Sequence, residues 1–300
     1  MKKRKDLILI SIFFVFLIII YLLLKPRPEN LKKEKIAPFD PPRRIVSLGP
    51  AITKGLYLLG VGDKLIADTV YCNKPPEAQS KQKIGTVTKV DVEKIVRLKP
   101  DLVLATSLSD AEQIEKLKNL GIRVIRFPKI NSFRELCESF FELGRTVGKK
   151  ELAKEIICQA EEEISLIKQK VMTMPKPKVL IQLGAKPLWV VTKDSFINDL
   201  IEIAGGINIG PSDQKGLYSR EEALKQNPDV IIIATMGIVG KEEKKIWQKY
   251  QTINAIRNNR IYIFNSDKLC SPTPVSFVGT LKELTKILHP QIKLKEGKDE

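Results

Sequence analysis

Histidine is nearly absent from this chain, whose 300 residues contain one, His289. A single histidine excludes metal sites built from several imidazoles and the serine–histidine–aspartate triad of hydrolases. The sequence also lacks a phosphate-binding P-loop, a G-x-S-x-G nucleophile elbow, an H-E-x-x-H pair and a G-x-G-x-x-G turn after a predicted strand. Asp and Glu are numerous, but no spacing pairs them recognisably. We therefore expect no enzymatic activity, no catalytic residues, no metal site and no resident cofactor.

Cysteine is also scarce. The four cysteines are Cys72, Cys137, Cys158 and Cys270, and their spacing matches no zinc or redox motif. Cys137 and Cys158 fall in helical patterns, and we expect both to be small buried residues. Cys72 and Cys270 fall in predicted loops, where they either pair as a disulfide outside the cytoplasm or remain thiols. The sequence leaves both alternatives open.

Acidic residues are outnumbered, so the net charge is +16. The Lys and Arg residues are scattered and interleaved with Glu instead of forming one block. We expect no nucleic-acid partner, because a basic stripe is what such a surface would show. The basic residues from Lys25 to Lys35 instead favour contact with anionic lipid head groups.

One long apolar run stands out against this polar background. The 18 residues from Leu7 to Leu24 carry no charge and follow Lys2, Lys3, Arg4 and Lys5. This length is at the lower end of what spans a hydrocarbon core of roughly 30 Å. The basic flank stays in the cytoplasm, so residues after about 26 are expected on the extracytoplasmic side. The alternative is a cleaved signal peptide, but no A-x-A-like site follows, so the sequence favours a retained transmembrane anchor.

After the anchor, the chain alternates predicted strands and helices. This alternation is typical of a mainly parallel sheet covered by helices. One long helix, predicted over residues 149–172 from apolar residues at a 3.6 period, interrupts the alternation. The expected organisation is an anchor (1–25), a linker with five prolines (26–42), a first lobe (43–148), the interlobe helix (149–173), a second lobe (174–290) and a charged, disordered tail (291–300).

The two lobes repeat one pattern. Residues 92–106, VEKIVRLKPDLVLAT, align without gaps to residues 220–234, REEALKQNPDVIIIA, and residues 43–50 resemble 178–185. Both long segments read as a helix, Pro-Asp and an apolar strand. Chance recurrence is the alternative, because Pro-Asp turns before buried strands are common. Matches in the same order favour two similar α/β lobes.

Ligands of open α/β sheets bind beyond the carboxyl ends of the strands. Tyr71 and Trp189 follow predicted strands of different lobes and offer flat apolar contact with a polar edge, although semi-buried packing is the alternative for each. Trp247 lies in a charged helical segment, which we expect to be away from the strand ends. The candidate ligand-binding residues are Ser47, Pro50, Ala51, Tyr71, Thr86, Val87, Gln182, Leu188, Trp189, Met236 and Asp267.

Several segments resemble the solute-binding proteins of metal-chelate ABC importers, which include cobalamin, ferric-siderophore and haem receptors. They are RRIVSLGPAITKGLYLLGVGDKLIADTVYCNKPPEA, KIGTVTKVDVEKIVRLKPDLVLAT, YSREEALKQNPDVIII and SPTPVSFVGTLKELTKILHP, within residues 43–290. The resemblance implies two lobes bridged by a backbone helix, with little hinge motion and the ligand held between them. It also implies an ABC permease and its ATPase as partners of a monomeric binding protein.

The same resemblance assigns permease docking to one glutamate on each lobe. The matching residues are Glu93 and Glu221, which are also equivalent in the internal alignment. The alternative is that both are acids favoured at a helix N-terminus.

The expected ligand is a corrinoid such as cobalamin, because Tyr71 and Trp189 match aromatics that cobalamin receptors use. Val87 and Lys215 stand where the best-known cobalamin receptor carries tryptophans, which keeps ferric siderophores open. Haem would need an axial ligand such as Tyr71. A chelatase-like enzyme and an anchored sensor without a permease are the alternatives of other classes.

Overall fold

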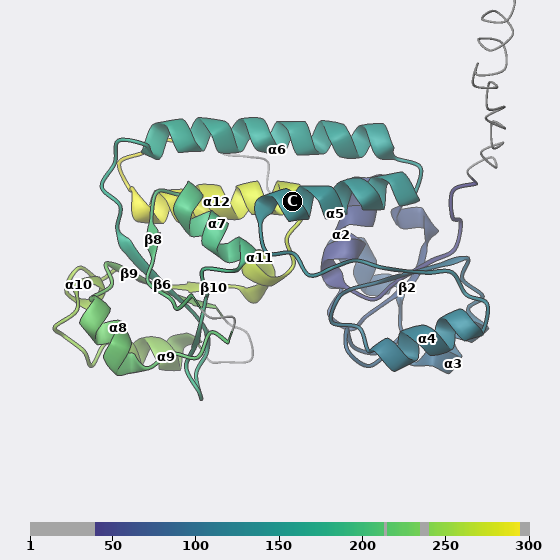
Figure 1. Cartoon of the computed structure of the whole chain (residues 1–300), viewed down its shortest axis with the longest axis horizontal. Coiled ribbons are helices and arrows are strands. Elements are labelled where there is room, and N and C mark those ends of the chain that lie inside the picture. The colour runs from purple at the N-terminus through teal and green to yellow at the C-terminus, as the bar shows by residue number, and fades with distance from the viewer. Residues whose placement is uncertain (1–39, 213–214, 235–239, 295–300) are drawn as a thin grey trace, which may run out of the picture. The chain divides into compact units, whose positions relative to one another are not determined.

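The computed structural model describes residues 40–212, 215–234 and 240–294 (Figure 1). The predicted anchor, nearly all of the linker, Met236 and residues 295–300 of the tail lie outside these ranges. None of the helices within them has both the length and the apolar character to cross a membrane. The described residues from Pro41 onward form one compact unit.

The first lobe is built on a five-stranded parallel sheet in the order β3-β2-β1-β4-β5. Alternate residues of its central strands point to opposite faces. Ile45 and Leu104 pack with one group of helices, and Val46 and Val103 pack with another. The elements are β1 (Ile45–Ser47), α2 (Pro50–Leu58), η1 (Gly62–Lys64), β2 (Leu65–Asp68), η2 (Pro76–Ser80), β3 (Gln82–Lys83), α3 (Val92–Arg97), β4 (Leu102–Ala105), α4 (Ala111–Asn119) and β5 (Val124–Arg126).

The second lobe repeats the order of the central strands. Strands β6, β9 and β10 are parallel neighbours, as β1, β4 and β5 are; β8 adds a further parallel partner of β6, and β7 is antiparallel to it. The sheets are therefore mainly parallel, as predicted. The elements are β6 (Lys178–Gly184), β7 (Trp189–Val190), α7 (Phe196–Ile203), β8 (Ile207–Asn208), α8 (Arg220–Gln226), β9 (Val230–Ala234), α9 (Gly240–Trp247), α10 (Asn254–Arg257), β10 (Ile261–Phe264), α11 (Ser266–Cys270) and α12 (Pro274–Leu288).

Two consecutive helices, α5 (Phe133–Thr146) and α6 (Lys150–Val171), bridge the two lobes. The predicted long helix is confirmed as α6, which lies along α5 and α12 (Figure 1). The helical pattern around Cys137 is confirmed by α5, whose bounds were not predicted; Leu136, Phe140 and Leu143 bury one of its faces at helical spacing. A Cβ atom at Gly144 would lie 2.4 Å from the Ala153 side chain, so this glycine lets α5 and α6 approach closely.

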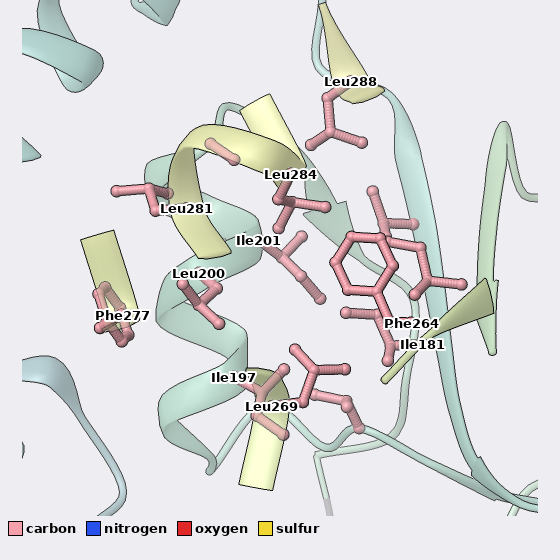
Figure 2. Close-up of a cluster of buried hydrophobic side chains, with 14 of the residues drawn as sticks. Ile181, Ile197, Leu200, Ile201, Phe264, Leu269, Phe277, Leu281, Leu284 and Leu288 are labelled. Carbon is pink, nitrogen blue, oxygen red and sulfur yellow. The ribbon is translucent and has the colours of Figure 1, made fainter. Parts of the chain in front are cut away.

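The core of the second lobe lies between its sheet and the helices α6, α7 and α12. Figure 2 shows Ile181 and Phe264 from the strands facing Leu200 and Ile201 of α7 and Leu284 of α12. The α5 residue Phe133 joins this core from outside the lobe, since its ring centroid is 4.7 Å from that of Phe277. Its backbone N–H also donates to the carboxylate of Asp199 at 2.7 Å.

The sequence repeat also appears in the backbone conformation and the hydrogen bonds of the two lobes. Lys99 and Asn227, equivalent in the alignment, both have positive φ, at 46° and 50°. The Asp101 carboxylate accepts the Arg43 N–H at 2.7 Å, and the Asp229 carboxylate accepts the Lys178 N–H at 2.8 Å. Each Pro-Asp therefore ties the end of a helix to the start of a neighbouring strand. The prediction of two similar α/β lobes is confirmed.

The first residues of the charged tail pack on this body. Ile292 contacts the core of the second lobe, and the Lys170 ammonium donates to the Lys293 carbonyl at 2.9 Å. The prediction of disorder is therefore wrong for residues 291–294. The apolar residues of this stretch pack on the second lobe, and the amino-acid composition of the tail does not reveal such a contact.

Candidate functional site

The loop after β2 presents an aromatic side chain to solvent. Tyr71 is 55% exposed and its neighbour Val70 is 45% exposed, whereas the next residue, Cys72, is fully buried. The Cys72 thiol lies 3.2 Å from the hydroxyls of Thr53 and Thr69. Burial raises the pKa of this thiol above its usual value. The buried cysteine therefore anchors the loop directly beside an outward-pointing tyrosine.

The buried position of Cys72 also bears on the disulfide alternative. No disulfide joins any of the four cysteines in the structure. Cys137 is buried as expected, but Cys158 is exposed on α6, so the expectation that it is a small buried residue is wrong. Cys72 lies in the interior of the first lobe and is occupied by two threonine hydroxyls. A bond from Cys72 to Cys270 is therefore not formed.

Ser47 does not present its side chain as predicted. It ends β1, but it is fully buried, and its hydroxyl accepts the Thr53 hydroxyl at 2.9 Å and donates to the Gly49 carbonyl at 3.1 Å. Its hydroxyl supports the first turn of α2 instead of facing a ligand, and we remove Ser47 from the candidate site. Pro50 and Ala51 follow in this turn and remain half-buried.

Thr86 and Val87 occupy a tight turn between the bridged residues Gly85 and Val90. The Thr86 hydroxyl accepts the Lys89 N–H at 3.0 Å, and the Thr86 N–H donates to the Lys89 carbonyl at 2.8 Å. The threonine side chain thus shapes the turn, which leaves Val87 half-buried near its tip. Both residues remain candidates for ligand contact.

The second lobe presents its own aromatic side chain on β7. Trp189 is 46% exposed and packs over Gly184 of β6, its partner in the antiparallel ladder. Leu188, one residue earlier, is buried in the core because neighbouring strand residues point to opposite faces. Leu188 therefore supports the strand, and Trp189 offers the contact surface.

A residue missed by the sequence analysis lies beside this tryptophan. Leu217 is 47% exposed and forms an isolated antiparallel bridge with Trp189. Val70, beside Tyr71, was missed in the same way. An exposed apolar residue next to an aromatic in a predicted loop is a weak sequence signal, because single exposed apolar residues are common on protein surfaces.

Gln182 is another strand-end residue that the structure buries. Its amide donates to the Glu243 carboxylate at 2.8 Å and accepts the Trp247 indole N–H at 2.7 Å. Arg220 completes this buried network: its guanidinium pairs with Glu243 at 2.6 Å and lies 4.6 Å from the Trp247 ring centroid. Gln182 is therefore a structural residue, and the expectation that Trp247 lies away from the strand ends is wrong.

The remaining predicted ligand contacts are less informative. Met236 lies outside the described residues. Asp267 is half-buried near the start of α11.

His289 is buried, with Nε2 3.0 Å from the Ala204 carbonyl oxygen, so its imidazole is engaged inside the protein. In the described ranges no group of three or more His, Cys, Asp or Glu residues has the arrangement to hold a metal ion.

Glu93 and Glu221 occupy matching positions on their helices. Each is the second residue of its helix, α3 or α8, and each is exposed. The preceding N-caps are also alike: Asp91 accepts the Lys94 N–H at 2.9 Å, and Ser219 accepts the Glu222 N–H at 3.0 Å. A helix N-terminus favours a carboxylate at such a position, but the exposure also leaves both available to a partner.

Residues 45–267 match the family model described as periplasmic binding protein. An uncharacterized ABC transporter substrate-binding lipoprotein of Bacillus subtilis is 31% identical over 259 residues, covering 83% of this chain and 81% of the relative. A vitamin B12-binding protein of Vibrio parahaemolyticus is 26% identical, covering 78% and 86%.

A solved structure supports the same assignment. It is titled a possible iron-binding (periplasmic solute-binding) protein of Staphylococcus epidermidis, and it is 27% identical with a TM-score of 0.73, covering 83% of this chain and all of that one. The matched residues include the first lobe, α6 and the second lobe up to the start of α11. This chain therefore belongs to the periplasmic binding protein family.

Proposed function

We propose that this protein is the extracytoplasmic solute-binding component of an ABC importer and that it binds a corrinoid such as cobalamin between its lobes. The observation that carries the proposal is the pair of exposed aromatics at the strand ends, Tyr71 in one lobe and Trp189 in the other. Each has an exposed aliphatic neighbour, Val70 or Leu217. A large ligand with an apolar rim can cover both pairs, and burial of such side chains contributes on the order of 1–3 kcal/mol each.

The printed names of relatives support this class of ligand. The Vibrio protein is named for vitamin B12, and the Bacillus protein is named as an ABC transporter substrate-binding lipoprotein. Both names describe binding proteins, and the Bacillus name places its protein with an ABC transporter, which argues against the chelatase alternative. A neighbouring permease and ATPase gene pair would separate the importer from an anchored sensor without a permease.

The second candidate ligand is a ferric siderophore. Val87 and Lys215 stand where tryptophans would strengthen a corrinoid site, and their absence weakens the case for a corrinoid. Lys215 is also exposed. A cation near the ligand suits an anionic chelate. Haem is the third candidate, with the exposed Tyr71 as its axial ligand.

Attachment to the membrane is part of the proposal. The Bacillus relative is named a lipoprotein. This chain has no cysteine before Cys72, so a lipid-modified cysteine after the apolar run is not available. We propose that residues 7–24 serve as a transmembrane anchor in place of a lipid, holding the binding domain near its permease. Intact-mass measurement of membrane-extracted protein tests this, and a mature chain beginning beyond residue 25 would exclude it.

The ligand is tested by absorption titration with cobalamin, haem and ferric chelates in parallel. We expect cobalamin to bind with a spectral shift and to quench the fluorescence of Trp189. Trp189→Ala should raise Kd by about tenfold or more, which corresponds to about 1.4 kcal/mol. Leu166→Ala, at an exposed leucine of α6, is the matched control and should leave Kd unchanged.

Two results would contradict the proposal. Unchanged cobalamin affinity in Trp189→Ala would remove this residue from the site. Tight binding of a ferric chelate or of haem, with none of cobalamin, would replace the corrinoid with that ligand.

A further inference from the structure

The loop that carries Tyr71 is tied to the rest of the lobe by its backbone near its start, where the Val70 N–H donates to the Gly85 carbonyl at 2.9 Å. Residues 69–81 leave the sheet at the end of β2 and return at β3, which pairs with β2 through only two residue pairs. Connections between parallel strands usually contain a helix that packs on the sheet. Here the connection contains only the short 3-10 helix η2. Beyond Val70, the conformation of the loop therefore depends on turns within the loop and on side-chain contacts.

Lys83 supplies three such contacts from the end of β3. Its ammonium donates to the Asp68 carboxylate at 2.7 Å, to the Cys72 carbonyl at 3.2 Å and to the Ala78 carbonyl at 3.0 Å. An ammonium has three N–H donors, so each donor has one acceptor. The contacts join the residue after Tyr71 to η2 and to the last residue of β2.

The carboxylate in this group is deeply buried. The Asp68 side chain has no exposed surface, and its second oxygen, Oδ2, has no hydrogen-bond partner within the part of the chain that the structure describes. A buried carboxylate strongly favours a nearby cation, because isolated charge is costly in the protein interior. Asp68 thus fixes the position of the Lys83 ammonium, and the ammonium fixes the two loop carbonyls.

We propose that Lys83 is a positioning residue for Tyr71. Cys72 is held on two sides, at its carbonyl by Lys83 and at its thiol by Thr53 and Thr69. Tyr71, the residue before Cys72, is thereby directed away from the interior of the lobe and held exposed. This proposal rests on the proposed function for the contact between Tyr71 and the ligand, and it adds the residue that prepares that contact before the ligand arrives.

The experiment is a double-mutant cycle of Lys83→Met with Tyr71→Ala, using cobalamin as the probe. Haem or a ferric chelate replaces cobalamin if the wild-type protein binds that instead. Because Lys83→Met leaves a buried carboxylate without its cation, the cycle is repeated with Lys83→Met combined with Asp68→Asn, which removes both charges. Lys64→Met is the control, since Lys64 pairs with Asp63 at 2.8 Å on the surface of the same lobe.

Lys83→Met should raise Kd by about tenfold in the wild-type background and by less than about twofold when Tyr71 is already alanine. Lys64→Met should have no effect in either background. Equal losses in both backgrounds would show that Lys83 acts on binding without Tyr71, and no loss in the wild-type background would show that it does not act at all. Either result would overturn the proposal.

Hydrogen exchange separates this proposal from the choice of ligand. Lys83→Met should speed amide exchange in residues 69–81 without changing residues 106–109, whose carbonyls are held by Arg126 instead. If no chelate binds the wild-type protein, the proposed function fails while faster loop exchange still supports the role of Lys83 in ordering the loop. If loop exchange is unchanged, the role of Lys83 fails whatever the ligand is.

Discussion

Removal of the Glu243 carboxylate should strongly destabilise the second lobe. One of its oxygens accepts hydrogen bonds from Arg220 at 2.6 Å and from Gln182 at 2.8 Å, and the Glu243 side chain is almost fully buried. In Glu243→Ala, the Arg220 charge loses its counter-ion and the Gln182 amide loses an acceptor. Breaking a buried ion pair in this way costs about 3–5 kcal/mol.

The assay is urea unfolding followed by tryptophan fluorescence. Trp247 reports directly on this network, because its ring stacks on Arg220 and its indole N–H donates to Gln182. The free energy of unfolding of Glu243→Ala should be lower than that of the wild type by about 3–5 kcal/mol. Glu243→Gln keeps an acceptor of similar shape and should lose less, about 1–3 kcal/mol.

Glu142→Ala is the matched control. Glu142 pairs with Arg145 at 2.7 Å on the exposed face of α5, where screening by water limits such a pair to about 1 kcal/mol or less. If Glu243→Ala also lost less than about 1 kcal/mol, the reasoning from burial would be refuted. It would mean that water or a rearranged side chain replaces the carboxylate at no great cost.

Two further predictions concern pH dependence and docking. Burial lowers the pKa of His289 below its ordinary 6.5, so the stability it contributes is present above that pH and is lost as pH falls through 6.5 toward the folded-state pKa. The difference in unfolding free energy between wild type and His289→Gln should therefore shrink between about pH 7.5 and about pH 5, and a constant difference would contradict this. Combined Glu93→Lys and Glu221→Lys should abolish transport while leaving Kd nearly unchanged, because both glutamates are exposed at helix N-termini. Normal transport by that variant would show that the two glutamates do not dock on the permease.

Most elements of the fold followed from local patterns. The alternation of apolar strands with capped helices predicted both lobes, and the 3.6 period predicted α6 to within a residue at each end. Short elements such as β3, β7 and β8 were not predicted, because two residues carry no periodicity of their own. They form because a neighbouring strand, β2 or β6, offers unpaired backbone groups.

The candidate site was only partly predictable. Tyr71 and Trp189, selected because each follows a predicted strand, have exposed side chains, but the same rule selected Ser47 and Gln182, which the structure buries. Strand order tells which residues reach the edge of a sheet. It does not tell which of them are then covered by a neighbouring helix or loop.

The sequence by itself determined the repeat of the two lobes and the equivalence of Glu93 and Glu221. N-caps and Pro-Asp turns act within a few residues, so similar segments adopt similar conformations wherever they lie in the chain. Only the tertiary structure decided that Lys83 donates hydrogen bonds to the loop that carries Tyr71. The same holds for the hydrogen bond from Gln182 to Glu243, which is 61 residues away. Such contacts depend on burial and on partners distant in sequence, because a buried charge or amide binds whichever group the packed fold brings within reach.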